Sequence, residues 1–175
     1  MVATVRLQIA LVWLCTIAAS STAHAFIPSA GEVRTGGLLG PAFLFGAPGR
    51  HSAAPLTLLG HGVYAIDSHV SAIASAGAAV AETSILRLRS GLRYQFNGLG
   101  RPLLPFLQTQ LSLAEIFAPS SRHAFYFGLA TGVGVDYFLT RRLGLIGLLQ
   151  VDTGAAAGHA VTTLELLVGV TYQVF

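Results

Sequence analysis

Cysteine, lysine and charged residues in general are scarce in this chain, and each scarcity excludes a class of function. The 175 residues contain one cysteine, Cys15, in an apolar N-terminal stretch that we expect to be removed. A mature chain without cysteine forms no disulfide, has no catalytic thiol and offers no thiolate to a metal. All the basic residues are arginines, and they are scattered. No basic run therefore indicates nucleic-acid binding.

Charged residues make up only 10% of the sequence, whereas a soluble domain usually carries about 25%. The mean hydropathy of +0.67 raises the question of membrane helices. Yet Asp136 interrupts the longest apolar stretch of the mature chain, 124–139, and two arginines separate it from the next one, 143–151. The latter is too short for a helical span but long enough for a tilted membrane strand.

The first 25 residues have the layout of a secretory signal peptide. Arg6 is followed by an apolar run over 7–19 and by an Ala-His-Ala cleavage site at 23–25. The alternative, an uncleaved anchor helix, is disfavoured because the apolar run is short for a span of about 20 residues. The expected domains are a signal peptide over 1–25 and an outer-membrane β-barrel over 26–175.

Residues 86–96 alternate with a period of two, which favours a strand over a helix. Leucines occupy 86, 88 and 92, whereas Arg87, Arg89 and Arg93 occupy the other parity. The same alternation recurs over 107–113, 125–137 and 164–174. One face is bulky and apolar, with aromatics near strand ends, and the other is small or polar. This is typical of a barrel that is apolar outside and polar inside. The alternative, an exported soluble sandwich or lipocalin-like barrel, would need more surface charge.

Turn signals divide the mature chain into eight expected strands. They lie near 33–46, 56–66, 70–81, 84–96, 103–114, 124–138, 143–152 and 161–175. We therefore predict an all-β fold, an eight-stranded antiparallel up-and-down transmembrane β-barrel with both mature termini on the periplasmic side. Short turns are expected at 67–69, 97–102 and 139–142, and longer loops at 47–55, 115–123 and 153–160. The connection at 82–83 is shorter than this pattern requires.

The last segment, 168–175, alternates and ends in Phe175. With the export signal and the eight strands, residues 31–175 resemble the small outer-membrane barrel families: the OmpA-type barrel domain, OmpX and OmpW. One departure is that the apolar parity ends at Val174, so Phe175 falls on the other parity. The resemblance implies the outer membrane of a Gram-negative bacterium, contact with lipid and lipopolysaccharide, and assembly machinery that reads the C-terminal strand. We expect a monomer with no nucleic-acid partner.

Six charged residues share the lumen parity of the expected strands: Arg87, Arg89, Arg93, Asp136, Asp152 and Glu165. Four glutamines join them: Gln108, Gln110, Gln150 and Gln173. Side chains fill the interior of an eight-stranded barrel. We therefore expect a buried network that plugs the lumen, with an ion pair between one of these arginines and an acid, Glu165 first. The alternative is a narrow, anion-favouring pore.

His69-Val70-Ser71 resembles the His-x-Ser pair of PagL-type lipid A deacylases, although the Asn that follows in that family is Ala72 here. On a strand this spacing would put both side chains on one face, as His-activated serine chemistry requires. His51, His123 and His159 fall in expected loops, where a metal site is a second alternative. We expect no catalytic residue, metal or cofactor. The expected role is structural or surface-interacting; the alternatives are a narrow pore for small solutes or ions and a lipid A-modifying enzyme.

Overall fold

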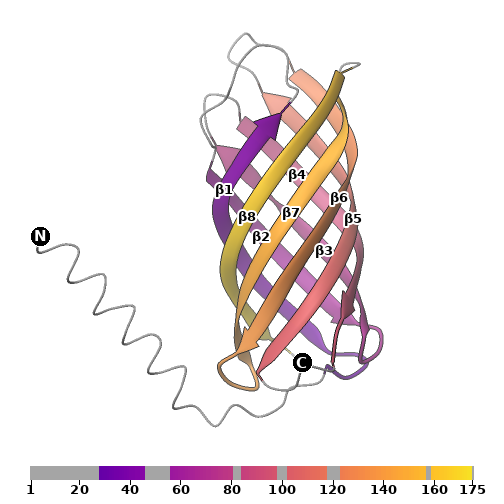
Figure 1. Cartoon of the computed structure of the whole chain (residues 1–175), viewed down its shortest axis with the longest axis vertical. Coiled ribbons are helices and arrows are strands. Elements are labelled where there is room, and N and C mark those ends of the chain that lie inside the picture. Colours follow the sequence, from indigo (N-terminus) through magenta and orange to yellow (C-terminus); the bar gives the residue numbers. More distant parts are fainter. Residues whose placement is uncertain are drawn as a thin grey trace, which may run out of the picture.

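The structure, a computed structural model, describes residues 28–45, 56–80, 84–97, 102–117, 123–156 and 159–174. Its eight strands are β1 (Val33–Phe45), β2 (Leu56–Ala65), β3 (Val70–Val80), β4 (Ser84–Gln95), β5 (Leu103–Phe117), β6 (His123–Phe138), β7 (Leu143–Ala156) and β8 (His159–Gln173). Each strand pairs antiparallel with the next, and β1 pairs with β8, so the sheet closes into a barrel (Figure 1). The predicted eight-stranded antiparallel barrel is confirmed. No helix in the described ranges is long and apolar enough to cross a membrane.

β5, β6 and β7 are longer than predicted, and β8 begins two residues earlier than predicted. β5 and β6 stay paired out to Phe117 and His123, and β7 and β8 stay paired out to Ala156 and His159. The predicted loops at 115–123 and 153–160 were therefore too long. Polar and small residues there suggested loops, but ladder hydrogen bonds join backbone groups and depend little on the side chains. The predicted loops at 47–55 and 82–83, most of the turn at 97–102, and Phe175 lie outside the described residues.

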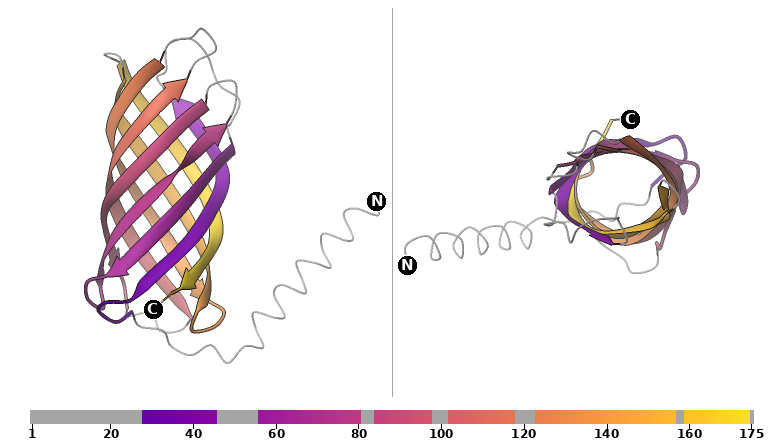
Figure 2. Two further views of the ribbon diagram at one scale, coloured as in Figure 1. Left: turned by 180° about the vertical axis from the view of Figure 1, so that it is seen from behind. Right: turned by 90° about the horizontal axis from the view of Figure 1, so that it is seen from above.

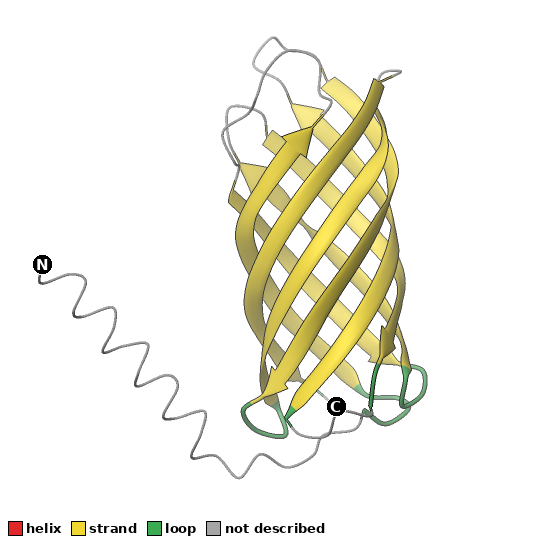
Figure 3. Ribbon diagram, viewed as in Figure 1, coloured by secondary structure: helices red, strands yellow, loops and turns green. Residues whose placement is uncertain are grey.

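The two ends of the barrel differ. β1 starts and β8 ends at the same end, where short turns join β2 to β3 and β6 to β7 (Figure 3); we call it the turn end, and the opposite one the loop end. Asp67 Oδ1 accepts backbone N–H bonds from His69 at 2.6 Å and Val70 at 2.8 Å. Thr140 Oγ1 likewise accepts from the N–H of Leu143 at 3.0 Å. These side chains satisfy the backbone of each turn, which is why the connections can be tight.

The wall has an apolar outer face and a mixed inner face. Leu88 is 57% exposed on the outside, whereas its neighbour Arg89 is 1% exposed on the inside. Large apolar side chains are exposed on every strand of the barrel. The outer face of β3 contributes least, because it consists of alanines between Val70 and Val80, of which Val80 is exposed. An apolar surface this extensive requires a nonaqueous surrounding. The barrel is therefore built to span a membrane.

Aromatic side chains mark the two edges of the apolar band. Four tyrosines lie on the turn-end side of the outer face, and four phenylalanines lie on the loop-end side. They are Tyr64, Tyr94, Tyr137 and Tyr172, and Phe43, Phe45, Phe125 and Phe127. Tyr137 lies ten positions after Phe127 on β6, about 33 Å along a strand. At a tilt of about 40° this distance gives roughly 25 Å, the usual height of the lipid-facing band.

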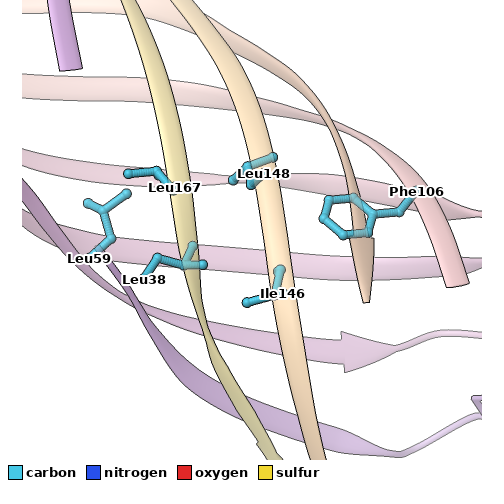
Figure 4. Close-up of a cluster of buried hydrophobic side chains, with 6 residues drawn as sticks. All are labelled: Leu38, Leu59, Phe106, Ile146, Leu148 and Leu167. Carbon is cyan, nitrogen blue, oxygen red and sulfur yellow. The ribbon is translucent and has the colours of Figure 1, made fainter. Parts of the chain in front are cut away.

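The core lies inside the barrel, which is seen end-on in Figure 2. One apolar layer consists of Leu38, Leu59, Phe106, Ile146, Leu148 and Leu167 (Figure 4). A second, nearer the loop end, consists of Ala79, Ile85, Ala114, Tyr126, Ala156 and Val161. Polar side chains occupy the rest of the lumen. The interior is therefore layered, and its polar layers hold the candidate site.

Candidate functional site in the barrel lumen

Four of the predicted lumen residues meet in one cluster, which we call the loop-side cluster: Arg87, Arg89, Asp152 and Glu165. Arg89 Nη2 lies 2.7 Å from Asp152 Oδ2, and Arg89 Nη1 lies 2.9 Å from Glu165 Oε2. Arg87 forms a second ion pair with Glu165 and donates to Thr163 Oγ1 at 3.2 Å. An arginine of β4 thus contacts Glu165 of β8 across the lumen, as the strand parity predicted.

Asp152 accepts hydrogen bonds from two further side chains. Tyr126 donates to its Oδ1 at 2.5 Å, and Ser112 donates to its Oδ2 at 2.7 Å. Hydrogen bonds to an ionised acceptor are shorter and stronger than neutral ones. Residues of β4, β5 and β6 are therefore tied to one buried carboxylate on β7. The two arginines and two acids of the loop-side cluster balance in charge, which a buried ionic group requires.

The remaining two predicted residues, Arg93 and Asp136, lie in a second cluster nearer the turn end. Asp136 Oδ2 is 3.3 Å from Arg93 Nη1 and 3.2 Å from Arg34 Nη1. Glu32 Oε1 lies 3.6 Å from Arg34 Nε. The guanidinium of Arg93 also sits 3.8 Å from the centroid of the Phe106 ring, a cation–π contact. We call Glu32, Arg34, Arg93 and Asp136 the turn-side cluster.

Arg34 and Glu32 were not predicted as lumen residues. Glycines at 36, 37 and 40 hide the alternation of β1, so its parity could not be read. Glu32 precedes the strand and is 5% exposed. Burial raises the pKa of Glu32, while the Ser29 backbone N–H and the charge of Arg34 lower it by less. A charge next to a glycine-rich run is the one signal that could have pointed to Arg34.

Three of the predicted glutamines form a chain of amides between the clusters. Arg93 Nη2 donates to Gln108 Oε1 at 2.9 Å. Gln108 Nε2 donates to Gln150 Oε1 at 2.8 Å and to Gln110 Oε1 at 3.3 Å. Gln110 Nε2 in turn donates to Ser75 Oγ at 3.3 Å. Gln173, the fourth, is half-buried at the turn end of β8. The polar side chains thus form a nearly continuous network along the lumen.

His69 and Ser71 do not share a face, so the prediction from their spacing was wrong. His69 lies in the turn before β3, where its ring stacks on Tyr94 of the outer wall at 5.9 Å. Its Nδ1 lies 2.9 Å from Ser68 Oγ. Ser71 is fully buried and points into the lumen. The two side chains therefore lie on opposite sides of the wall, because alternation begins only where the strand begins.

Only one of the three loop histidines has a described side chain. His51 lies outside the described residues, the structure does not describe the side chain of His123, and His159 is exposed at the start of β8. Among the described residues, no group of three or more histidines, cysteines or acids is placed to hold a metal ion. Two interior cavities, one near Arg87 and one near His61, measure about 10 Å³ each. Each has room for roughly one water.

Neither a protein-family model nor a curated protein sequence matches this chain. Solved structures do match. Neisserial surface protein A is 18% identical, with a TM-score of 0.67 over 80% of this chain and 96% of that one. The N-terminal β-barrel domain of Pseudomonas aeruginosa OprF is 16% identical, with a TM-score of 0.62 over 83% and 99%. Ail, the attachment invasion locus protein of Yersinia pestis, is 14% identical, with a TM-score of 0.51 over 82% and 99%.

These likenesses define a class of fold. The chain is similar in fold to the small eight-stranded barrels of the bacterial outer membrane, and the predicted resemblance is confirmed. Because the sequence identities are low, the likeness concerns the fold, and the role of this barrel must come from its own residues.

Proposed function

We propose that this protein is an integral outer-membrane β-barrel with a structural or surface-interaction role and a lumen closed by its polar network. The observation that supports closure is the loop-side cluster, in which two arginines and two acids of at most 6% exposure span the lumen from β4 to β7 and β8. An ion that entered would have to displace these pairs and replace their hydrogen bonds. The apolar layers on either side add a further barrier to hydrated ions.

A role outside the lumen is supported by the class of fold. Ail is named an attachment invasion locus protein, and for this chain we infer only that the barrel presents its loop end to a partner or stabilises the membrane. We further infer that the turn end faces the periplasm, because short turns lie there in such barrels. Lipid and lipopolysaccharide then surround the wall of a monomer. We also propose that the assembly machinery reads β8 and Phe175.

Planar-bilayer recording tests the closed lumen. The wild-type barrel should insert without discrete conductance steps, with insertion verified by a shift in gel mobility on boiling. A matched variant with Arg89, Gln108 and Gln150 changed to serine removes three of the polar side chains that fill the lumen, so it should show conductance steps more often than the wild type. Discrete steps from the folded wild-type barrel would establish the narrow pore instead. Unchanged lipid A acyl chains on expression, measured by mass spectrometry, are expected if the barrel is not a lipid-modifying enzyme.

A further inference from the structure

The cavity beside His61 lies among buried polar groups that have no hydrogen-bond partner. Its lining includes His61 of β2, Ser75 of β3, Arg93 of β4 and Gln150 of β7, with Leu38 and Leu148 among the apolar residues. Both ring nitrogens of His61, Nε of Arg93 and Nε2 of Gln150 are buried and have no hydrogen-bond partner among the described residues. His61 is 8% exposed, Arg93 is 3% exposed and Gln150 is 1% exposed. Buried nitrogens from three strands around one cavity need a hydrogen-bonding partner there, such as a water or an ion.

The chemistry of these groups follows from Arg93. A guanidinium only donates hydrogen bonds, so the atom of Gln108 that faces Arg93 Nη2 must be the oxygen. The amide nitrogen of Gln108 then faces Gln150, which must present its own oxygen. The N–H groups of Gln150 are therefore left for the cavity. Although amide orientations are ambiguous in most sites, the arginine fixes them here.

The same reasoning extends to the other lining groups. Gln108 also donates to the oxygen of Gln110, so Gln110 donates to Ser75 Oγ, and the hydroxyl proton of Ser75 is available to a ligand. Arg93 contributes its Nε–H. His61 contributes at least one N–H in either tautomer. The cavity therefore presents about four donors, whereas a water molecule has two acceptor lone pairs.

We propose that this cavity binds one monovalent anion of halide size, such as chloride, within the barrel lumen. An anion accepts from all the donors at once, and a single water does not. Arg93 supplies positive charge at the cavity itself, whereas Glu32, the acid that balances the second arginine of the turn-side cluster, contacts Arg34 and is not among the residues that line the cavity. The site is also small: a cavity of about 10 Å³ leaves room for a single small ion at most. The anion would lie between the apolar side chains of Leu38 and Leu148 and the chain of glutamine amides.

Anomalous diffraction locates the anion directly. Crystals of the whole barrel grown with sodium bromide in place of sodium chloride should show an anomalous peak between Arg93, His61 and Gln150. A lumen without a bromide peak overturns the proposal. The same holds if bromide occupies only the outer surface, or if a water refines at the site in both salts.

Thermal unfolding in micelles provides a second test with matched variants. The midpoint of the mobility shift should be higher in sodium chloride than in sodium gluconate of equal ionic strength, by roughly a few °C. The difference should be lost in Gln150→Met, which keeps the side-chain length but removes the donor. It should persist in Gln173→Met, the same change outside the cavity. An equal salt response in all three proteins contradicts an internal site. Conductance from the wild type would refute the closed lumen but leave the bromide peak as the test of this site.

Discussion

Replacing Glu165 with glutamine is the perturbation to which the loop-side cluster should respond most. Glu165 is fully buried and pairs with both Arg87 and Arg89. In Glu165→Gln, Arg89 keeps Asp152, but Arg87 keeps only the neutral hydroxyl of Thr163 among the contacts described. Leaving a buried charge without its partner costs about 3–5 kcal/mol. We expect the free energy of unfolding to fall by this amount.

A double variant separates the stranded charge from the lost contacts. In Arg87→Met with Glu165→Gln, Arg89 and Asp152 still balance in charge, so no buried guanidinium is left unpaired. The double variant should therefore be more stable than Glu165→Gln alone, even though it carries more changes. The coupling between the two sites should fall in the range of about 0.5–3 kcal/mol that contacting residues show.

The assay is urea unfolding from lipid vesicles, followed by gel mobility and circular dichroism. Fluorescence is unsuitable because Trp13, the one tryptophan, lies in the expected signal peptide. The matched control is Glu115→Gln, the same chemical change at a half-buried residue near the loop end of β5, which should cost at most about 1 kcal/mol. If the double variant is as unstable as the sum of the two single variants, the reasoning about a stranded charge is refuted.

Four further predictions concern the wall, one glycine, one turn and the leader. Leu129→Arg places a charge on the lipid face and should cost about 2–4 kcal/mol in vesicles; unchanged stability would mean that the face is wrongly assigned. Gly91→Ala would put a Cβ 2.0 Å from a carbonyl oxygen of β5, whereas the Cβ of Gly62→Ala would have no described atom within 4 Å. Gly91→Ala should therefore destabilise the barrel by about 1–3 kcal/mol, and Gly62→Ala should not. Two backbone N–H groups hold the pKa of Asp67 below its ordinary value of 3.8. The stability that the wild type has over Asp67→Ala should therefore be constant above about pH 4 and be lost as the pH falls further. A stability difference that persisted in acid would contradict this. N-terminal sequencing of the membrane-extracted protein should return Phe26, and a sequence that starts at Met1 would show that no leader is cleaved.

Alternation in the sequence predicted the strands and the orientation of most side chains. Arg87, Arg89 and Arg93 point inward because the leucines beside them face the lipid. Side chains alternate between the two faces of a strand, so the arginines must lie on the opposite face from the leucines. The ion pairs of Arg87 and Arg89 with Glu165 could then be predicted, because the Glu165 side chain has the inward parity of β8. Residues on strands with one bulky face were therefore predictable one by one.

Three features were not predictable for separate physical reasons. Arg34 and Glu32 lie beside glycines, which mark neither face. The ends of β5 to β8 depend on backbone pairing, which continues through residues whose side chains resemble those of loops. The cavity beside His61 depends on distances across the lumen between four strands, and alternation within one strand carries no such information.

Membrane fractionation with a heat-modifiability gel tests the central claim, a folded barrel spanning the outer membrane, most directly. The protein should sediment with outer membranes, resist extraction by urea and alkali, and change its gel mobility only after boiling. Recovery in the periplasmic fraction, with the same mobility before and after boiling, would contradict the claim.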